Sequence, residues 1–115
     1  MKITPTVCIF ESLKYNEEDS YKEGEIICRT LRLSNVLTKY TYMRTRTELK
    51  RFAEAFGQSP HKILHLSCHA NNDNFCLTLE NVPYEELAEI LGPHLEGCRL
   101  FISACRGTHQ YFADQ

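Results

Sequence analysis

The sequence lacks the features that mark several large classes of protein. It has no uninterrupted apolar stretch near the length of about 18 residues that a membrane span requires, and Met1 to Thr6 lack the apolar region of a signal peptide. The formal net charge is −2, so no overall attraction to nucleic acid is expected. We therefore expect a cytoplasmic protein that binds neither membranes nor nucleic acid.

None of the six cysteines belongs to a Cys-x-x-Cys pair, which removes the usual redox and zinc-ribbon motifs. Four of them lie in or beside apolar runs, where a reduced cysteine is a small buried hydrophobe: Cys8, Cys28, Cys68 and Cys98. This usage favours a reducing compartment over a disulfide framework.

The chain has 115 residues, of which 43% are hydrophobic and 24% charged, and no repeat or low-complexity linker interrupts it. This length and composition are typical of one folded domain, which we assign to residues 1–115. Short apolar or β-rich segments predict strands at Thr6–Phe10, Leu37–Met43, Lys62–Ser67, Phe75–Leu79 and Cys98–Ala104.

Helices are predicted between these strands. The first runs up to Leu33 behind a capping cluster at 16–20, the second is capped by Thr47 and stops at Gly57, and the third runs from Pro83 to Leu91. Alternation of strands and helices predicts an α/β fold, a three-layer sandwich whose mainly parallel sheet has helices on both faces. The segment 37–43 is the more exposed strand and is expected at an edge.

Two residues near the carboxyl ends of predicted strands could form a catalytic pair. A cysteine attacks as a thiolate, so it needs a neighbouring base and donors that hold the oxyanion. His69 and Cys105 each follow an apolar strand, and the carboxyl ends of parallel strands converge. We predict that the two side chains meet there.

The stretches Ile63–His69 (Ile-Leu-His-Leu-Ser-Cys-His) and Leu100–Gly107 (Leu-Phe-Ile-Ser-Ala-Cys-Arg-Gly) resemble the paired motifs of caspase-like cysteine peptidases, most closely the bacterial branch called CHAT peptidases. The resemblance implies a cysteine endopeptidase with His69 as base and Cys105 as nucleophile. It also implies oxyanion donors in the backbone amides of Ala70 and Cys105.

The same resemblance implies protein or peptide substrates, no metal or organic cofactor, and control by a partner in a bacterial defence or signalling system. Arg106 and Ser103 are further candidates for substrate contacts. Only ten residues follow Cys105, whereas the family completes its sheet with further strands. We expect a catalytic half that is incomplete on its C-terminal side, completed by a second chain or by a missing C-terminal half.

Other interpretations remain open. A catalytically inactive caspase-like interaction module is favoured by Ala70, which stands where the family usually has glycine, while the His69 and Cys105 pair favours the enzyme. A zinc site built on His61, His65, Cys68 and His69 conflicts with strand alternation, which directs Cys68 away from His65 and His69. His65 is interpreted as a hydrogen-bonded structural histidine, and Asp73 is a candidate to orient His69.

Overall fold

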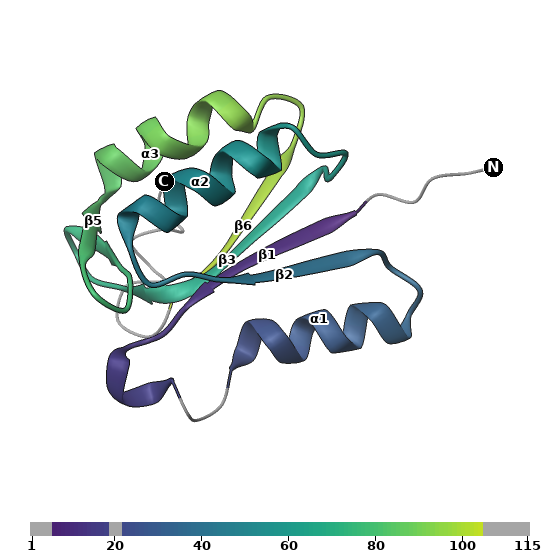
Figure 1. Ribbon diagram of the computed structural model, residues 1–115, viewed down its shortest axis with the longest axis horizontal. Helices are drawn as coiled ribbons and strands as arrows, with labels where there is room; N and C mark the ends of the chain where they lie inside the picture. Colours follow the sequence, from purple (N-terminus) through teal and green to yellow (C-terminus); the bar gives the residue numbers. More distant parts are fainter. Residues whose placement is uncertain (1–5, 19–21, 105–115) are drawn as a thin grey trace.

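The computed structural model describes residues 6–18 and 22–104, which form an α/β fold with a mixed six-stranded sheet and three α-helices (Figure 1). The strands are β1 (Val7–Ser12), β2 (Thr38–Tyr42), β3 (Ile63–Ala70), β4 (Asn74–Cys76), β5 (Asn81–Pro83) and β6 (Arg99–Ala104). The helices are α1 (Glu23–Leu33), α2 (Arg46–Gly57) and α3 (Tyr84–Leu91), with 3₁₀-helices η1 (Tyr15–Glu17) and η2 (Gly92–His94). Within these ranges, no helix combines the length and apolar character that crossing a membrane requires.

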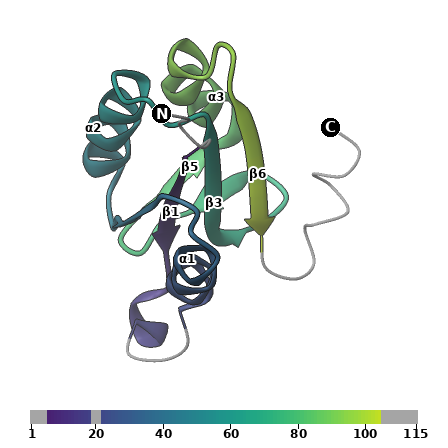
Figure 2. The ribbon, with the colours of Figure 1, turned by 90° about the vertical axis from the view of Figure 1, so that its right-hand side faces the viewer.

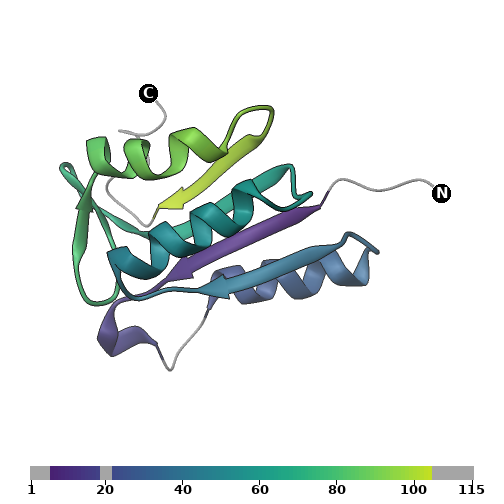
Figure 3. The ribbon, with the colours of Figure 1, turned by 45° about the horizontal axis from the view of Figure 1, so that its top comes forward.

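The sheet combines parallel and antiparallel ladders. β2 pairs with β1, β1 with β3, and β3 with β6, all in parallel, and Figure 3 shows these strands side by side with their arrowheads pointing the same way. β3 also pairs with β4, and β4 with β5, in antiparallel fashion. β2 lies at one end of the strand order, as the sequence predicts for an edge strand.

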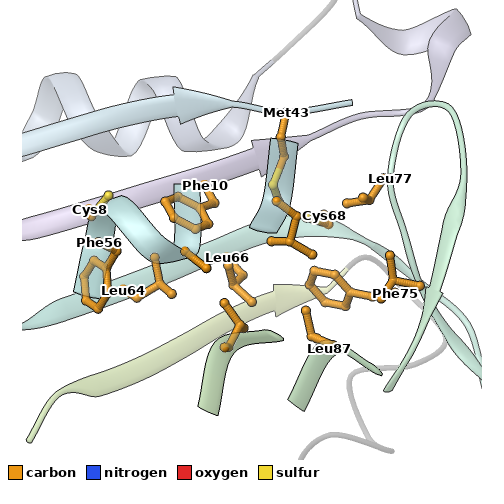
Figure 4. Packing of buried hydrophobic residues seen from close by; sticks show 14 residues of the cluster. Cys8, Phe10, Met43, Phe56, Leu64, Leu66, Cys68, Phe75, Leu77 and Leu87 are labelled. Carbon is orange, nitrogen blue, oxygen red and sulfur yellow. The ribbon is translucent and has the colours of Figure 1, made fainter. Parts of the chain in front are cut away.

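One face of the sheet carries the larger apolar core. Alternate residues of β1 and β3 point to this side, among them Phe10, Leu64 and Leu66, which are at most 1% exposed (Figure 4). They pack with the buried faces of α2 and α3, represented by Phe56 and Leu87. Burial of these side chains stabilises the packing of α2 and α3 on the sheet.

The opposite face carries a smaller apolar cluster and is covered by α1. Val7 and Ile9 of β1 pack there with Cys28 of α1, and Figure 2 shows α1 on the other side of the strands from α2 and α3. Further along β1, Glu11 lies on this same face and is fully buried. The α1 face therefore changes from apolar to polar toward the carboxyl ends of the strands.

The start of α1 differs from the sequence-based prediction. The N-cap is Lys22, without a side-chain cap bond, so the prediction of a cap in the cluster 16–20 is wrong. Instead, Oε2 of Glu11 accepts a 2.8 Å hydrogen bond from the Gly24 amide. A Cβ at Gly24 would lie 3.0 Å from Cδ of Glu11, so glycine permits this close approach.

The cap of α2 also differs. Thr45, rather than Thr47, is the N-cap, and its hydroxyl accepts a 3.2 Å hydrogen bond from the Glu48 amide. Its extended backbone, with φ −132° and ψ 162°, is the conformation that an N-cap adopts. The prediction that Thr47 caps this helix is therefore wrong.

Strand bounds near the predicted site are corrected as well. β3 continues through His69 to Ala70, three residues beyond the predicted end at Ser67, because β4 pairs with its last two residues. β4 is shorter than predicted and ends at Cys76. β6 begins at Arg99, one residue after the predicted start, and its apolar run is only partly covered, with Leu100 38% and Phe101 50% exposed.

Candidate functional site

The predicted catalytic residues fall at the ends of β3 and β6. His69 and Ala70 are the last two residues of β3, and Ser103 lies in β6. Cys105 and Arg106 lie outside the described residues. The geometry of the site is therefore built from β3, β4, η1 and β6.

His69 contacts a carboxylate from a distant part of the chain. Its Nε2 lies 2.5 Å from Oε1 of Glu17, the last residue of η1, and 13% of the His69 side chain is exposed. A carboxylate at Nε2 favours the tautomer whose proton sits on that nitrogen and fixes the plane of the ring. The role of an orienting acid, expected for Asp73, thus belongs to Glu17.

Asp73 has a local role in the turn between β3 and β4. The Asp73 and Asn74 amides both donate to Oδ1 of Asn71, at 2.9 and 2.7 Å. An asparagine that accepts amides two and three residues ahead is a common way to stabilise a tight turn. Residues 71–74 therefore form the hairpin turn that brings β4 alongside β3.

The backbone amide of Ala70 points toward the β6 edge of β3. The Ile63 amide donates to the Thr6 carbonyl before β1 at 3.3 Å, and the Asn71 amide donates to the Asn74 carbonyl beside β4 at 2.9 Å. Alternate residues of a strand direct their amides to opposite edges, so the odd-numbered amides face β1 and β4. By the same alternation, the Ala70 amide is directed to the other edge of β3, the edge that pairs with β6.

A cavity of about 580 Å³ opens beside His69. Its walls come from the η1 segment, the end of β3 and the β4–β5 hairpin, with Lys14, Glu17, Asn71 and Cys76 among the lining residues. Most of these side chains are polar, so they can form hydrogen bonds and ion pairs with a bound molecule. A larger hollow of about 910 Å³ between α2 and α3 contains none of the predicted site residues.

The thiol of Cys76 lines this cavity. It is directly opposite His69 in the β3–β4 ladder, and opposite residues of an antiparallel pair share a face of the sheet. Burial raises the pKa of the Cys76 thiol, with only a smaller opposing influence from Lys14. Cys76 therefore favours the neutral thiol, the less nucleophilic form.

His65 and Ser103 form a contact between β3 and β6. His65 Nε2 lies 2.9 Å from Oγ of Ser103, so His65 is hydrogen-bonded as the sequence suggested. Burial lowers the pKa of His65, while Glu23 and Glu11 act in the opposite direction. The Ser103 hydroxyl, a candidate for substrate contact, is engaged with this imidazole.

The zinc interpretation finds no support among residues 6–18 and 22–104, in which no group of three potential His, Cys, Asp or Glu ligands gathers. Cys68 is buried in the core beneath α2 and α3. His65 and His69 belong to the alternate set of β3 side chains, which faces the other way.

Sequence reasoning missed the groups that hold the η1 segment in place. Glu18 accepts hydrogen bonds from Tyr42 and Arg44 of the β2 end, at 2.6 and 2.8 Å. The hydrogen bond to Arg44 is the main reason that the pKa of Glu18 is lowered, and the bond to Tyr42 adds to it. The only sequence signal was the acidic character of the cluster, which was interpreted as a helix cap.

No protein-family model matches the chain, and a search of curated proteins finds no match.

Proposed function

We propose that this chain is the catalytic portion of a caspase-like cysteine endopeptidase, with His69 as general base and Cys105 as nucleophile. The mainly parallel part of the sheet and the helices on its two faces would then form the three-layer sandwich of that clan. The proposal includes a cytoplasmic location, protein or peptide substrates, and control by a partner in a bacterial defence or signalling system.

The register of β3 and β6 carries this proposal. The two strands are parallel neighbours, and their ladder runs from the Ile63–Arg99 pair to the Cys68–Ala104 pair. The residues that follow this last pair in sequence are His69 and Cys105. Because paired strands lie about 4.8 Å apart, a ladder that ends one residue before them supports an imidazole and a thiol at neighbouring positions.

The proposed reaction uses the nitrogen of His69 that does not contact Glu17. With Nε2 held by the carboxylate, Nδ1 takes the proton of the Cys105 thiol, and the thiolate attacks the peptide carbonyl carbon. The negative charge that forms on the carbonyl oxygen is held by the backbone amides of Ala70 and Cys105. The C–N bond breaks, His69 returns the proton to the leaving amine, and water hydrolyses the thioester.

The backbone at Ala70 does not oppose this role. Among the described non-glycine residues, only Asn35 has a positive φ, so Ala70 lies in ordinary strand conformation without the freedom that glycine would add. The side of β3 to which its amide points is the side of β6. Ala70 in place of the family's glycine is therefore compatible with an oxyanion donor.

We further propose that another strand, from a second chain or a C-terminal half, pairs with the outer edge of β6. Within the described residues β6 pairs only with β3, and Leu100 and Phe101 on its two faces are 38% and 50% exposed. An apolar strand edge is a template for further pairing. Arg106, next to the proposed nucleophile in sequence, is a candidate to contact substrate in the completed site.

The exposed pair on β6 also favours a second function, an inactive caspase-like interaction module. In that case the sheet would serve association, and His69 would be held by Glu17 without a catalytic partner. The two functions differ in the reactivity of one thiol, which gives a direct test.

The test compares the thiols of Cys105 and Cys76. The protein is treated with iodoacetamide at neutral pH, and the alkylation rate of each cysteine is followed by peptide mass spectrometry. Base activation by His69 predicts that Cys105 reacts at least about tenfold faster than Cys76 and that His69→Ala removes the difference. Equal rates for the two thiols would reject the enzyme in favour of the interaction module.

Proteolysis supplies the second readout. Cleavage of fluorescein-labelled casein is measured for the chain alone and for the chain mixed with the second chain or C-terminal half that we propose to pair with β6. Two matched variants are compared. Cys105→Ala should reduce cleavage by at least about a hundredfold, while Cys76→Ala should retain it. If Cys76→Ala loses cleavage and Cys105→Ala keeps it, the nucleophile is Cys76 and our assignment of Cys105 is wrong.

A further inference from the structure

A single hydroxyl group contacts both ends of the segment that carries Glu17. The Leu13 amide, just after β1, donates to Oη of Tyr42 at 3.1 Å. The same hydroxyl donates to Oε2 of Glu18 at 2.6 Å. Tyr42, the last residue of β2, therefore pins positions 13 and 18, and the residue that reaches His69 lies between them.

The hydrogen bonds around Tyr42 form a chain with one direction. The Thr78 hydroxyl lies 3.2 Å from the Tyr42 hydroxyl and 3.0 Å from the Ser12 hydroxyl, and the Thr78 amide donates to Oγ of Ser12. A hydroxyl donates once, and the Tyr42 proton goes to Glu18 because an ionised carboxylate can only accept. Thr78 must then donate to Tyr42, and Ser12 to Thr78.

This chain joins three parts of the fold to the η1 segment. It begins at the end of β1, passes through the β4–β5 hairpin and β2, and ends on the Glu18 carboxylate. Hydrogen bonds that point the same way polarise and strengthen one another. The cavity wall and the segment that holds Glu17 are thus fixed relative to each other by one network.

Arg44 and Lys22 add charge to the same place. Arg44 binds Glu18 through two nitrogens, with Nε 2.8 Å from Oε2 and Nη2 3.1 Å from Oε1. Two-point contact between a guanidinium and a carboxylate fixes direction as well as distance. The Lys22 ammonium lies 5.2 Å from the centre of the Tyr42 ring, within the range of a cation–π contact.

We propose that Tyr42 is a positioning residue for His69, which acts by fixing the segment 13–18 so that the Glu17 carboxylate stays against Nε2 of the imidazole. Glu17 is adjacent to Glu18, so release of the Glu18 carboxylate also releases the backbone that aims Glu17. The consequence for catalysis rests on the proposed function, whereas the effect on the imidazole does not.

The first readout is the tautomer of His69. Protein labelled with nitrogen-15 at histidine is examined by long-range proton–nitrogen NMR, and the His69 signals are identified by their loss in His69→Gln. In the intact protein the spectrum should show the tautomer of His69 that carries its proton on Nε2. Tyr42→Phe should add signals from the Nδ1–H tautomer.

Tyr40→Phe is the matched control. Tyr40 lies on the same strand and also donates to a carboxylate, but its partner is Oε1 of Glu11 at 2.5 Å, which lies outside the segment 13–18. It should leave the His69 spectrum unchanged. Glu18→Gln, which keeps the shape of Glu18 and removes its charge, should shift the tautomer in the same direction as Tyr42→Phe.

Thermal unfolding of each variant guards against a general loss of structure. If Tyr42→Phe does not fold, Glu18→Gln carries the test. A His69 spectrum that stays as in the parent protein in every folded variant of this pair would overturn the positioning role. A spectrum that changes equally in Tyr40→Phe would also overturn it, because the effect would then be a general response of β2.

The catalytic consequence is read from alkylation of Cys105 by iodoacetamide. A misdirected base should lower that rate about tenfold in Tyr42→Phe and leave it unchanged in Tyr40→Phe. A changed tautomer with no base activation of Cys105 in the parent protein would support the positioning role and reject the proposed peptidase. An unchanged tautomer, together with a Cys105 alkylation rate that depends on His69, would reject the positioning role and support the proposed peptidase.

Discussion

The two faces of β3 differ in chemistry although they belong to one strand. Leu64, Leu66 and Cys68 are at most 2% exposed and lie in the apolar core beneath α2 and α3. The residues between and after them, His65, Ser67 and His69, make hydrogen bonds to hydroxyl and carboxylate groups. Since successive side chains of a strand point to opposite faces, one strand separates the groups that stabilise the fold from the groups that could react.

The polar face has its own anchor in Glu11. This carboxylate is fully buried and accepts hydrogen bonds from the Gly24 amide, the Tyr40 hydroxyl and the Ser67 hydroxyl. It therefore joins α1, β2 and β3 at the end of the sheet where His69 lies. Burial raises the pKa of Tyr40, and the hydrogen bond to Glu11 raises it further.

Leu66→Ala should have the largest effect on stability. Leu66 is fully buried in the larger core, so truncation should lower the free energy of unfolding by about 3 kcal/mol, measured by urea denaturation. Leu79→Ala is the control, because Leu79 is 61% exposed and its truncation should change stability by less than about 0.5 kcal/mol.

The same experiment tests the comparison between the faces. His69→Ala should lower stability by only about 1 kcal/mol, since it removes the hydrogen bond to Glu17 at the wall of a cavity and no side chain of the apolar core. If His69→Ala costs as much as Leu66→Ala, the polar face of β3 is as important for stability as the apolar face, and the separation fails.

Glu11→Gln should have the next largest effect. The amide of glutamine keeps the shape of the side chain but lacks the charge of the carboxylate to which three donors bond. Its N–H groups would also point at these donors. We expect Glu11→Gln to lower the free energy of unfolding by about 2 kcal/mol, the scale of hydrogen bonds to charged groups.

The control for Glu11 is Glu25→Gln on the exposed side of α1. Glu25 pairs with Arg29 one turn later at 3.3 Å, and an exposed pair of this kind contributes less than about 0.5 kcal/mol. Equal losses in the two variants would show that burial of Glu11 adds nothing to its hydrogen bonds.

The apolar pattern predicted most of the secondary structure because burial sets it. The periodic face of α2 and the apolar runs of β1 and β3 are present, with boundary shifts where polar residues continue an element. His69 and Ala70 were placed beyond the strand because they interrupt its apolar run. Pairing with β4 extends the strand through them, and a pairing partner is not visible in a local pattern.

The partner of His69 could not have been predicted from the sequence. Glu17 lies 52 positions before His69, in a polar cluster whose acids suggested a helix cap. Thr45 and Thr47 show the same limit at short range, since either can cap a helix and only the backbone path selects Thr45. The meeting of His69 and Cys105 stays a prediction.

The smallest expected effect is a change in how stability depends on pH. Burial lowers the pKa of His65 from its ordinary value of 6.5, so below about pH 6.5 the unfolded chain binds a proton that the folded chain does not. Stability contributed by the neutral His65 is present above that pH and is lost as the pH falls toward the folded pKa. His65→Gln should therefore flatten the decline in unfolding free energy between about pH 6.5 and pH 5.5, by at most about 1.4 kcal/mol per pH unit. Burial also lowers the pKa of His61, so His61→Gln should remove a separate part of the dependence of unfolding free energy on pH. If His65→Gln keeps the full pH dependence of the parent protein and His61→Gln abolishes it, the polar face of β3 does not contribute to acid sensitivity.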